Sequence, residues 1–312
     1  MQITDIQLDE GRLRLCTDGP HQGFADGVHA LEAQAIDEVY RPLILGTSVW
    51  ERERIWLALR DAGRQAHLPP STWGLVDIAL WDLLGKAQGL PVFRAAGGFR
   101  DRVPVYRLGA GTTDELAAQA LAAKEKGLWG FKFGVGGRAD PAALALRLRQ
   151  AVGDGFRLLC DGGRALDLEH ALGLGRALDE IGAHWYEEPL AEGDVAALQK
   201  LADALDLPVV AGAFADGEPT AATRALSTRA VDRLRFVLPT AGGITDALKL
   251  LRGAEALGMN CEIDWRRGGS PHAAAHLLGA ARNAELLAVD ADTPLPVQDG
   301  HALVPTEPGL GL

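Results

Sequence analysis

The stretch Gly130-Phe131-Lys132-Phe133-Gly134-Val135 decides the fold, because the strand that it forms belongs to a series with a near-constant interval. Onward from Lys132, residues at or near the ends of the predicted strands recur after 29, 26, 26, 24 and 27 residues, at Asp161, Glu187, Ala213, Val237 and Asp264. One strand, one helix and two loops fill an interval of that length. The spacing therefore predicts a repeated strand and helix unit.

Strands and helices alternate through the part of the chain that contains this series. The strands are expected at 103–108, 130–135, 157–161, 184–187, 209–211, 233–237, 260–264 and 286–289. Helical patterns are expected at 114–126, 141–152, 168–181, 194–205, 245–257 and 271–281. Such alternation predicts an α/β protein with a parallel sheet, and eight strands close that sheet into a barrel. Reacting groups then lie at the carboxyl ends of the strands.

Length, composition and charge exclude several classes of protein. A chain of 312 residues suits a barrel of roughly 200 to 250 residues plus a smaller part. Apolar residues make up 47%, but no apolar run approaches the roughly 18 residues that cross a bilayer, so no membrane role is expected. A net charge of −11 argues against binding nucleic acid. No secretory signal is visible at the start, so a cytoplasmic location is expected.

Residues 1–100 lack the regular repeat and indicate a separate smaller part. Residues 71–88 place apolar side chains at helical spacing after a serine cap at Ser71. Gly97-Gly98 and Pro104 mark a turn and the expected boundary. The three cysteines are an odd number without a Cys-x-x-Cys pair, which supports neither a disulfide framework nor a zinc ribbon.

Several short motifs occur in a fixed order along nearly the whole chain. They are Ala79-Leu80-Trp81-Asp82 with Gly85-Lys86-Ala87, Gly97-Gly98, Phe131-Lys132, Cys160-Asp161, Trp185-Tyr186-Glu187-Glu188-Pro189, Gly242-Gly243-Ile244-Thr245 and Pro308-Gly309-Leu310-Gly311. In this order and spacing the chain resembles the enolase superfamily, in its mandelate racemase and muconate-lactonizing branch. The resemblance implies a modified TIM barrel, (β/α)7β, with an α+β N-terminal capping domain. The expected parts are the cap at 1–100, the barrel at 101–290 and a segment at 291–312 that returns to the cap.

The chemistry that the resemblance implies is removal of the proton next to a carboxylate. In the family a magnesium ion on three acidic strand ends stabilises the enediolate, and lysine or a histidine–aspartate pair moves the proton. Asp161 and Glu187 match the first two metal ligands, and Lys132 matches the first lysine of the Lys-x-Lys pair. The positions of the second lysine, the third carboxylate, the strand-six base and the strand-seven histidine hold Gly134, Ala213, Val237 and Asp264.

Two interpretations of the retained residues stay open. In the first, Asp161 and Glu187 bind Mg²⁺ weakly, with Glu188, Asp216 or Asp264 as a substitute third ligand, and Lys132 and Asp264 are the catalytic residues. In the second, Lys132 and the acids only pair with one another. No organic cofactor is expected. The short link at 6–12 between the first two strands replaces the mobile loop of relatives and predicts an open mouth.

Four arginines are expected at the rim of the barrel, where they would grip a small carboxylate or another anion. They are Arg107, Arg164, Arg266 and Arg267. A guanidinium can bind a carboxylate through two parallel N–H groups. The alternative is that they are ordinary solvated charges. His272 and His276, four residues apart, have a spacing that can bind zinc, but they lack the neighbouring glutamate of the zinc motif and are more simply a helix face.

The sequence therefore predicts a divergent member of the group with altered or reduced racemase or lyase chemistry, since both proton carriers and one metal ligand are missing. The alternative is a pseudoenzyme, a non-catalytic barrel that acts by binding or assembly. A homo-oligomer is expected in either case, as relatives form.

Overall fold

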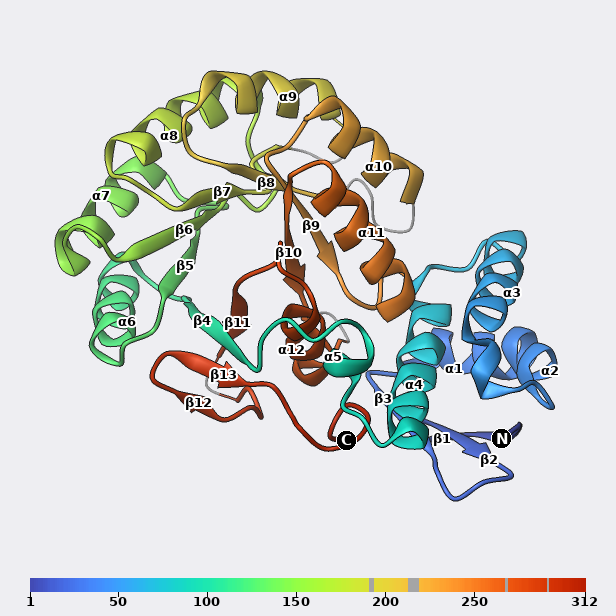
Figure 1. The fold of residues 1–312 in the computed structure, drawn as a ribbon. Coiled ribbons are helices and arrows are strands. Elements are labelled where there is room, and N and C mark those ends of the chain that lie inside the picture. Colours follow the sequence, from blue (N-terminus) through green and yellow to red (C-terminus); the bar gives the residue numbers. More distant parts are fainter. Residues whose placement is uncertain (191–193, 213–218, 267–268, 291) are drawn as a thin grey trace.

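The computed structural model describes residues 1–190, 194–212, 219–266, 269–290 and 292–312, which form a barrel with a smaller N-terminal part beside it (Figure 1). The N-terminal part contains a three-stranded antiparallel sheet and a group of helices. Its elements are β1 (Ile3–Asp9), β2 (Arg12–Thr17), β3 (Gly23–Asp26), α1 (Ala30–Ala35), a π-helical turn (Ile36–Tyr40), α2 (Arg41–Ile44), a 3-10 turn (Val49–Glu51), α3 (Arg52–Gln65), α4 (Ser71–Gln88) and α5 (Val92–Ala95).

Helix α4 lies between the N-terminal sheet and the barrel, and nearly all of its side chains are buried. Its predicted bounds of 71–88 are confirmed, but the predicted serine cap is wrong. Ser71 is the first residue within the helix, and Pro70 occupies the cap position. The Ser71 hydroxyl therefore does not cap the helix and instead donates to Glu32 Oε1 at 2.8 Å. Glycine at position 23 allows the close packing of β3, since a Cβ there would lie 2.1 Å from the carbonyl oxygen of Ala79.

Two buried acids of α4 hold the N-terminal part against the rest of the chain. Asp77 accepts hydrogen bonds from the Thr245 backbone N–H, at 2.8 Å, and from its hydroxyl. Asp82 accepts from the backbone N–H groups of Phe24, at 2.9 Å, and Leu310, at 2.8 Å. Each acid thus satisfies donors at a junction, where an unpaired buried group would be costly.

The barrel alternates strands and helices as predicted. The strands are β4 (Arg102–Leu108), β5 (Gly130–Gly134), β6 (Arg157–Asp161), β7 (Trp185–Glu187), β8 (Val209–Ala211), β9 (Arg233–Val237), β10 (Asn260–Asp264) and β11 (Leu287–Val289). The helices are α6 (Thr113–Glu125), α7 (Pro141–Val152), α8 (Leu168–Glu180), α9 (Val195–Ala204), α10 (Pro219–Thr228), α11 (Ile244–Ala256) and α12 (Pro271–Ala280). Helix α10 lies where no helix was predicted.

The strands follow one another around the barrel in chain order. Hydrogen-bonded parallel pairs run from β4 to β10, and β11 pairs with β4 in parallel. On its other side β11 lies beside β10, where the Trp265 indole N–H donates to the carbonyl oxygen of Ala288 at 2.9 Å. The helices form an outer layer around these strands (Figure 1). The fold is the predicted modified TIM barrel with an N-terminal cap.

The last residues add a hairpin that the sequence did not predict. Strands β12 (Val297–Gln298) and β13 (His301–Leu303) pair with each other, and β13 pairs antiparallel with β4. Beyond the hairpin the backbone reaches α5, where the Val92 N–H donates to the Gly309 carbonyl oxygen at 2.9 Å. Across the described ranges, no helix is both long and apolar enough to traverse a bilayer.

Strand alternation divides the barrel side chains into an inner and an outer set. The inner set includes a small apolar cluster of Tyr106, Leu159, Trp185, Val210, Leu286 and Ala288. The outer set packs against the helices in a much larger core. Above the inner apolar cluster, toward the carboxyl ends of the strands, the interior side chains are charged.

Candidate functional site

The two acids that were predicted to lie side by side do so. Asp161 ends β6 and Glu187 ends β7, and the two are partners in the parallel register, as are Gly134 and Asp161. Lys132 lies two residues before Gly134 on the same face of β5 and points into the barrel. The regular interval in the sequence thus brings these side chains together at one end of the barrel.

Lys132 is fully engaged by Glu187. Its Nζ donates to both carboxylate oxygens, at 2.8 and 2.9 Å, and lies 3.8 Å from Asp161 Oδ2. The lysine is 4% exposed and Glu187 is 2% exposed. Burial alone would raise the pKa of Glu187, but the charges of Lys132 and Arg235 outweigh it and hold that pKa below its usual value. Glu187 is therefore an ionised acceptor.

Arg235 is a site residue that the sequence analysis missed. It lies on β9, two residues before Val237, and its Nε is 2.9 Å from Glu187 Oε1. One terminal nitrogen donates to Asp264 Oδ2, and the other lies 3.8 Å from Glu188 Oε1. The available signal was strand alternation, which turns residues 235 and 237 of a strand to the same side.

Asp264 is held between two guanidinium groups. Arg266 donates from Nε to Oδ1 at 3.0 Å and from a terminal nitrogen to Oδ2 at 2.8 Å, and Arg235 contacts Oδ2 from the other side. Burial would raise the pKa of Asp264, but the Arg266 hydrogen bonds and the Arg235 charge hold it well below its usual range. Asp264 is therefore a weak base at neutral pH, which argues against its predicted role as a proton carrier.

Asp161 is the least restrained of these acids. Its side chain is 30% exposed, and its Oδ1 accepts the Gly163 backbone N–H at 2.9 Å. Glu188, the next residue after β7, accepts the Gly212 N–H on its Oε1 at 3.0 Å and has a left-handed backbone with φ of 42°. We refer to Lys132, Asp161, Glu187, Arg235, Asp264 and Arg266 as the interior ion-pair network.

The four predicted arginines do not lie together. Arg266 belongs to the network, and the Arg164 backbone N–H donates to the Glu188 carbonyl oxygen at 2.7 Å, which places its loop beside the mouth. Arg267 lies outside the described residues. The prediction for Arg107 is wrong, because strand alternation directs it away from the interior, where its neighbour Tyr106 points.

Arg107 instead lines a hollow of about 460 Å³ on the outer side of the barrel, together with Lys126, Leu128 and residues of the C-terminal segment. A different arginine, Arg138, lies near the carboxyl ends of β4 and β5. Its Nε donates to the Gly134 carbonyl oxygen at 3.0 Å, and a terminal nitrogen donates to the Gly111 carbonyl oxygen at 2.7 Å. The mouth thus has an arginine that the sequence analysis did not select.

The positions of the missing family residues have different surroundings. Gly134 is exposed, and a Cβ at this position would meet no atom within 4 Å. Val237 is fully buried. Ala213 and Asp216 lie outside the described residues. The His272 and His276 pair does not form an open metal site, because His276 is buried and its Nδ1 accepts the Phe93 N–H at 3.1 Å.

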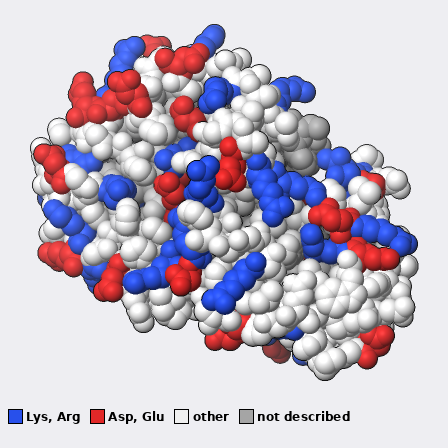
Figure 2. Space-filling view, in the orientation of Figure 1, with Lys and Arg blue, Asp and Glu red and all other residues white. Residues whose placement is uncertain are grey.

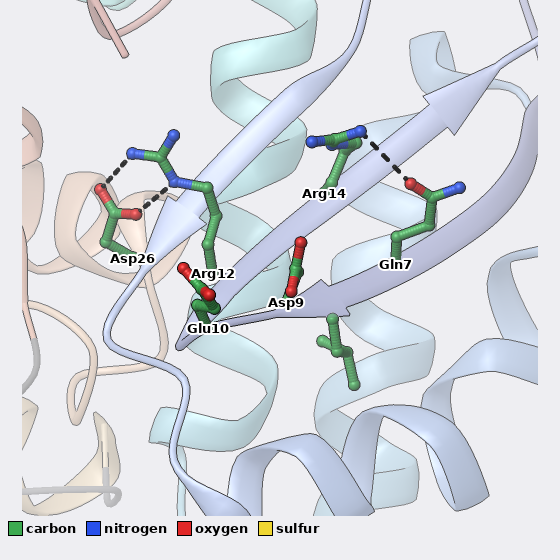
Figure 3. A pocket seen from close by; sticks show the side chains of 7 residues that line it. Gln7, Asp9, Glu10, Arg12, Arg14 and Asp26 are labelled. Atoms are coloured by element: carbon green, nitrogen blue, oxygen red, sulfur yellow. Dashed lines mark hydrogen bonds and ion pairs between the residues drawn. The ribbon is translucent and has the colours of Figure 1, made fainter.

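A separate hollow of about 610 Å³ lies on the N-terminal sheet (Figure 3). Its lining is polar, with an Arg12–Asp26 ion pair and a hydrogen bond from Arg14 to Gln7. On the face of the molecule in Figure 2, basic and acidic side chains are interspersed. That face offers no broad basic surface of the kind that binds nucleic acid.

Comparison with known proteins agrees with this fold. Residues 115–312 match the family model described as enolase C-terminal domain-like. The chain is 30% identical over 307 residues to L-Ala-D/L-Glu epimerase from Bacillus subtilis (strain 168). The aligned region covers 92% of this chain and 81% of the epimerase. This chain belongs to the enolase superfamily, in the mandelate racemase and muconate-lactonizing group.

Solved structures of the same group superimpose on nearly the whole chain. D-glucarate dehydratase from Agrobacterium tumefaciens, complexed with magnesium, has a TM-score of 0.87 at 27% identity and covers 99% of this chain and 93% of its own. L-talarate dehydratase from Polaromonas sp. JS666, complexed with Mg and L-glucarate, has a TM-score of 0.87 at 27% identity. Its superposition covers 96% of this chain and 88% of the dehydratase chain. The three relatives named here are thus one epimerase and two dehydratases.

Proposed function

We propose that this chain binds a small carboxylate or another anion at the barrel mouth, and that its racemase or lyase chemistry next to that carboxylate is altered or reduced. The observation that carries the proposal is the double hydrogen bond from Lys132 Nζ to Glu187. This contact occupies both the one retained lysine and one of the two retained metal ligands. A lysine that donates to both oxygens of a carboxylate acts as the counterion of that carboxylate.

Magnesium was the cofactor that the resemblance implied, and the described residues do not fit it. Magnesium requires oxygen ligands in a near-octahedral arrangement at about 2.1 Å. Both oxygens of Glu187 accept N–H groups, and the described ranges contain no group of three or more His, Cys, Asp or Glu side chains that could hold a metal ion. We therefore assign no step of the reaction to a metal.

The chain's own residues support anion binding. Arg138 and Arg266 present N–H groups close to Gly134 and Asp264, and the Arg266 side chain is 34% exposed. The space beside Gly134, where relatives carry a lysine, is open. A carboxylate that entered there would meet guanidinium groups, which bind it through paired hydrogen bonds.

Calorimetry with glucarate and an Ala-Glu dipeptide, the compounds in the relatives' names, tests the binding part of the proposal. We expect binding without added metal, weakened at least about tenfold in Arg138→Ala because one charge-assisted contact of about 1.5 kcal/mol or more is lost. Leu146→Ala, which removes an exposed side chain of helix α7, is the control and should leave binding unchanged. Equal affinity in Arg138→Ala and the native protein would refute this site.

Proton exchange tests the catalytic part. In D₂O, the α-proton signal of either compound should decay only slowly with the native protein, with or without Mg²⁺, because Lys132 and Asp264, the two described candidates for the proton carrier, are both held in ion pairs. Magnesium-dependent exchange that Asp161→Asn abolishes would show instead that the family reaction is retained.

A pseudoenzyme that acts by binding or assembly is the second candidate. It is favoured by the positions of the two missing bases, which hold Gly134 and Val237. Self-association, expected from the resemblance, belongs to this proposal. Light scattering that gives the mass of one chain at micromolar concentration would remove assembly from it.

A further inference from the structure

Arg235 lies at the centre of the acids that face the barrel mouth. Its guanidinium reaches Glu187 and Asp264 directly, and one terminal nitrogen is 3.8 Å from Glu188. These acids come from β7, from the residue after β7 and from β10, so the arginine connects strands on either side of β9. Its side chain is only 10% exposed.

Buried carboxylates that lie close enough to share one guanidinium require a cation among them. Each ionised carboxylate loses most of its hydration on burial, and like charges raise the cost further. In many proteins a divalent metal meets this requirement, and in others a lysine or an arginine does. Arginine is suited to the task because it remains charged and presents five N–H donors in a fixed plane.

The oxygen atoms of Glu187 and Asp264 are all in use. Glu187 Oε1 accepts from Lys132 and Arg235, and Oε2 accepts from Lys132. Asp264 Oδ1 accepts from Arg266, and Oδ2 accepts from Arg266 and Arg235. A metal ion that approached either carboxylate would meet these cations and their positive charge first.

From these contacts we infer that the Arg235 guanidinium is a built-in counterion that takes the place of a divalent metal at the barrel mouth. The arginine excludes the metal by charge and by occupying the carboxylate oxygens. This inference concerns the source of positive charge in the site, and it stands whether or not a carboxylate ligand binds.

Metal titration of the native protein and of Arg235→Ala tests the inference. Mn²⁺, followed by its electron paramagnetic resonance signal, replaces Mg²⁺ as the probe. The native protein should show no saturable site at millimolar Mn²⁺. Arg235→Ala should bind Mn²⁺ at least about tenfold more tightly, because removal of one nearby positive charge at an effective dielectric constant of about 20 favours a cation by at least that factor. Arg235→Lys, which keeps the charge, should behave as the native protein.

A saturable Mn²⁺ site in the native protein would overturn the inference, and this measurement needs no variant. Equal Mn²⁺ affinity in folded Arg235→Ala and Arg235→Lys would also overturn it. If Arg235→Ala fails to fold, the double variant Arg235→Ala/Asp264→Asn removes one cation and one anion together. Its circular dichroism spectrum reports folding, and it should still gain Mn²⁺ affinity through Asp161, Glu187 and Glu188.

Discussion

At the scale of single residues, the charges in the barrel interior determine what the site can do. A buried acid with two cationic partners is ionised at neutral pH, and Lys132 is the counterion of Glu187. Lys132 and Asp264, the two predicted catalytic residues, are both held in ion pairs, and the low pKa of Asp264 makes it a poor base. The interior ion-pair network is therefore better suited to holding charge than to moving a proton.

The low pKa of Asp264 predicts a contribution to stability that depends on pH. A carboxyl whose pKa falls on folding stabilises the protein at pH values above its unfolded pKa, about 3.9, and this contribution is lost as the pH falls through the folded pKa. At pH 7, Asp264→Asn should lower the free energy of unfolding by about 3 kcal/mol, because the buried Arg235 and the partly exposed Arg266 both lose this carboxylate. Urea unfolding at pH 7 measures this loss.

The same variant should show a smaller loss of stability than the native protein when the pH falls below about 4. Asp290→Asn, which changes an exposed acid, is the control and should keep the native pH dependence. An identical acid response in Asp264→Asn and in the native protein would show that Asp264 is not perturbed by its arginines.

At the scale of helices and strands, the cap and the barrel are joined by acids in α4. Asp82 connects β3 through Phe24, the C-terminal segment through Leu310, and the next turn of its own helix through Lys86, whose Nζ is 2.6 Å away. One buried side chain thus fixes three segments that are far apart in the sequence. This junction explains why Asp82 occurs in a largely apolar helix.

Removal of this acid should loosen the C-terminal segment. Asp82→Ala leaves two backbone N–H groups without acceptors, and each unsatisfied buried group costs about 1 to 3 kcal/mol. We expect the free energy of unfolding to fall by about 3 kcal/mol, with faster hydrogen exchange at Leu310. Lys86→Ala removes the ion pair and the contact of Nζ with the Phe24 ring but leaves both backbone N–H groups paired, and it should cost about 1 kcal/mol. Native exchange rates at Leu310 in Asp82→Ala would contradict the proposed junction.

At the scale of the whole molecule, the fold was largely predictable because each repeat has its own local signal. The eight barrel strands lie within a residue or two of their expected positions, since an interval of 24 to 29 residues permits only one strand and one helix. The C-terminal hairpin was missed because β12 and β13 are two and three residues long and pair only with each other and with β4.

The site was predictable where it depended on strand ends and not where it depended on strand faces. Asp161 and Glu187 were found because both end a strand. Arg235 was missed because the family's strand-six base matches position 237 and not position 235. Arg107 was misplaced because a shift of one residue along a strand turns the side chain to the opposite face of the sheet. The partners of Arg235 could not be inferred from sequence, since they lie on strands more than 25 residues away.

The central claim is that the acids at the barrel mouth are neutralised by the chain's own lysine and arginines. A crystal structure determined in the presence of Mg²⁺ tests it most directly. We predict that Lys132 Nζ and Arg235 Nε will contact Glu187 and that no metal will lie between Asp161 and Glu187. Density between these two acids with octahedral oxygen ligands at about 2.1 Å, and with Arg235 turned away, would contradict the account.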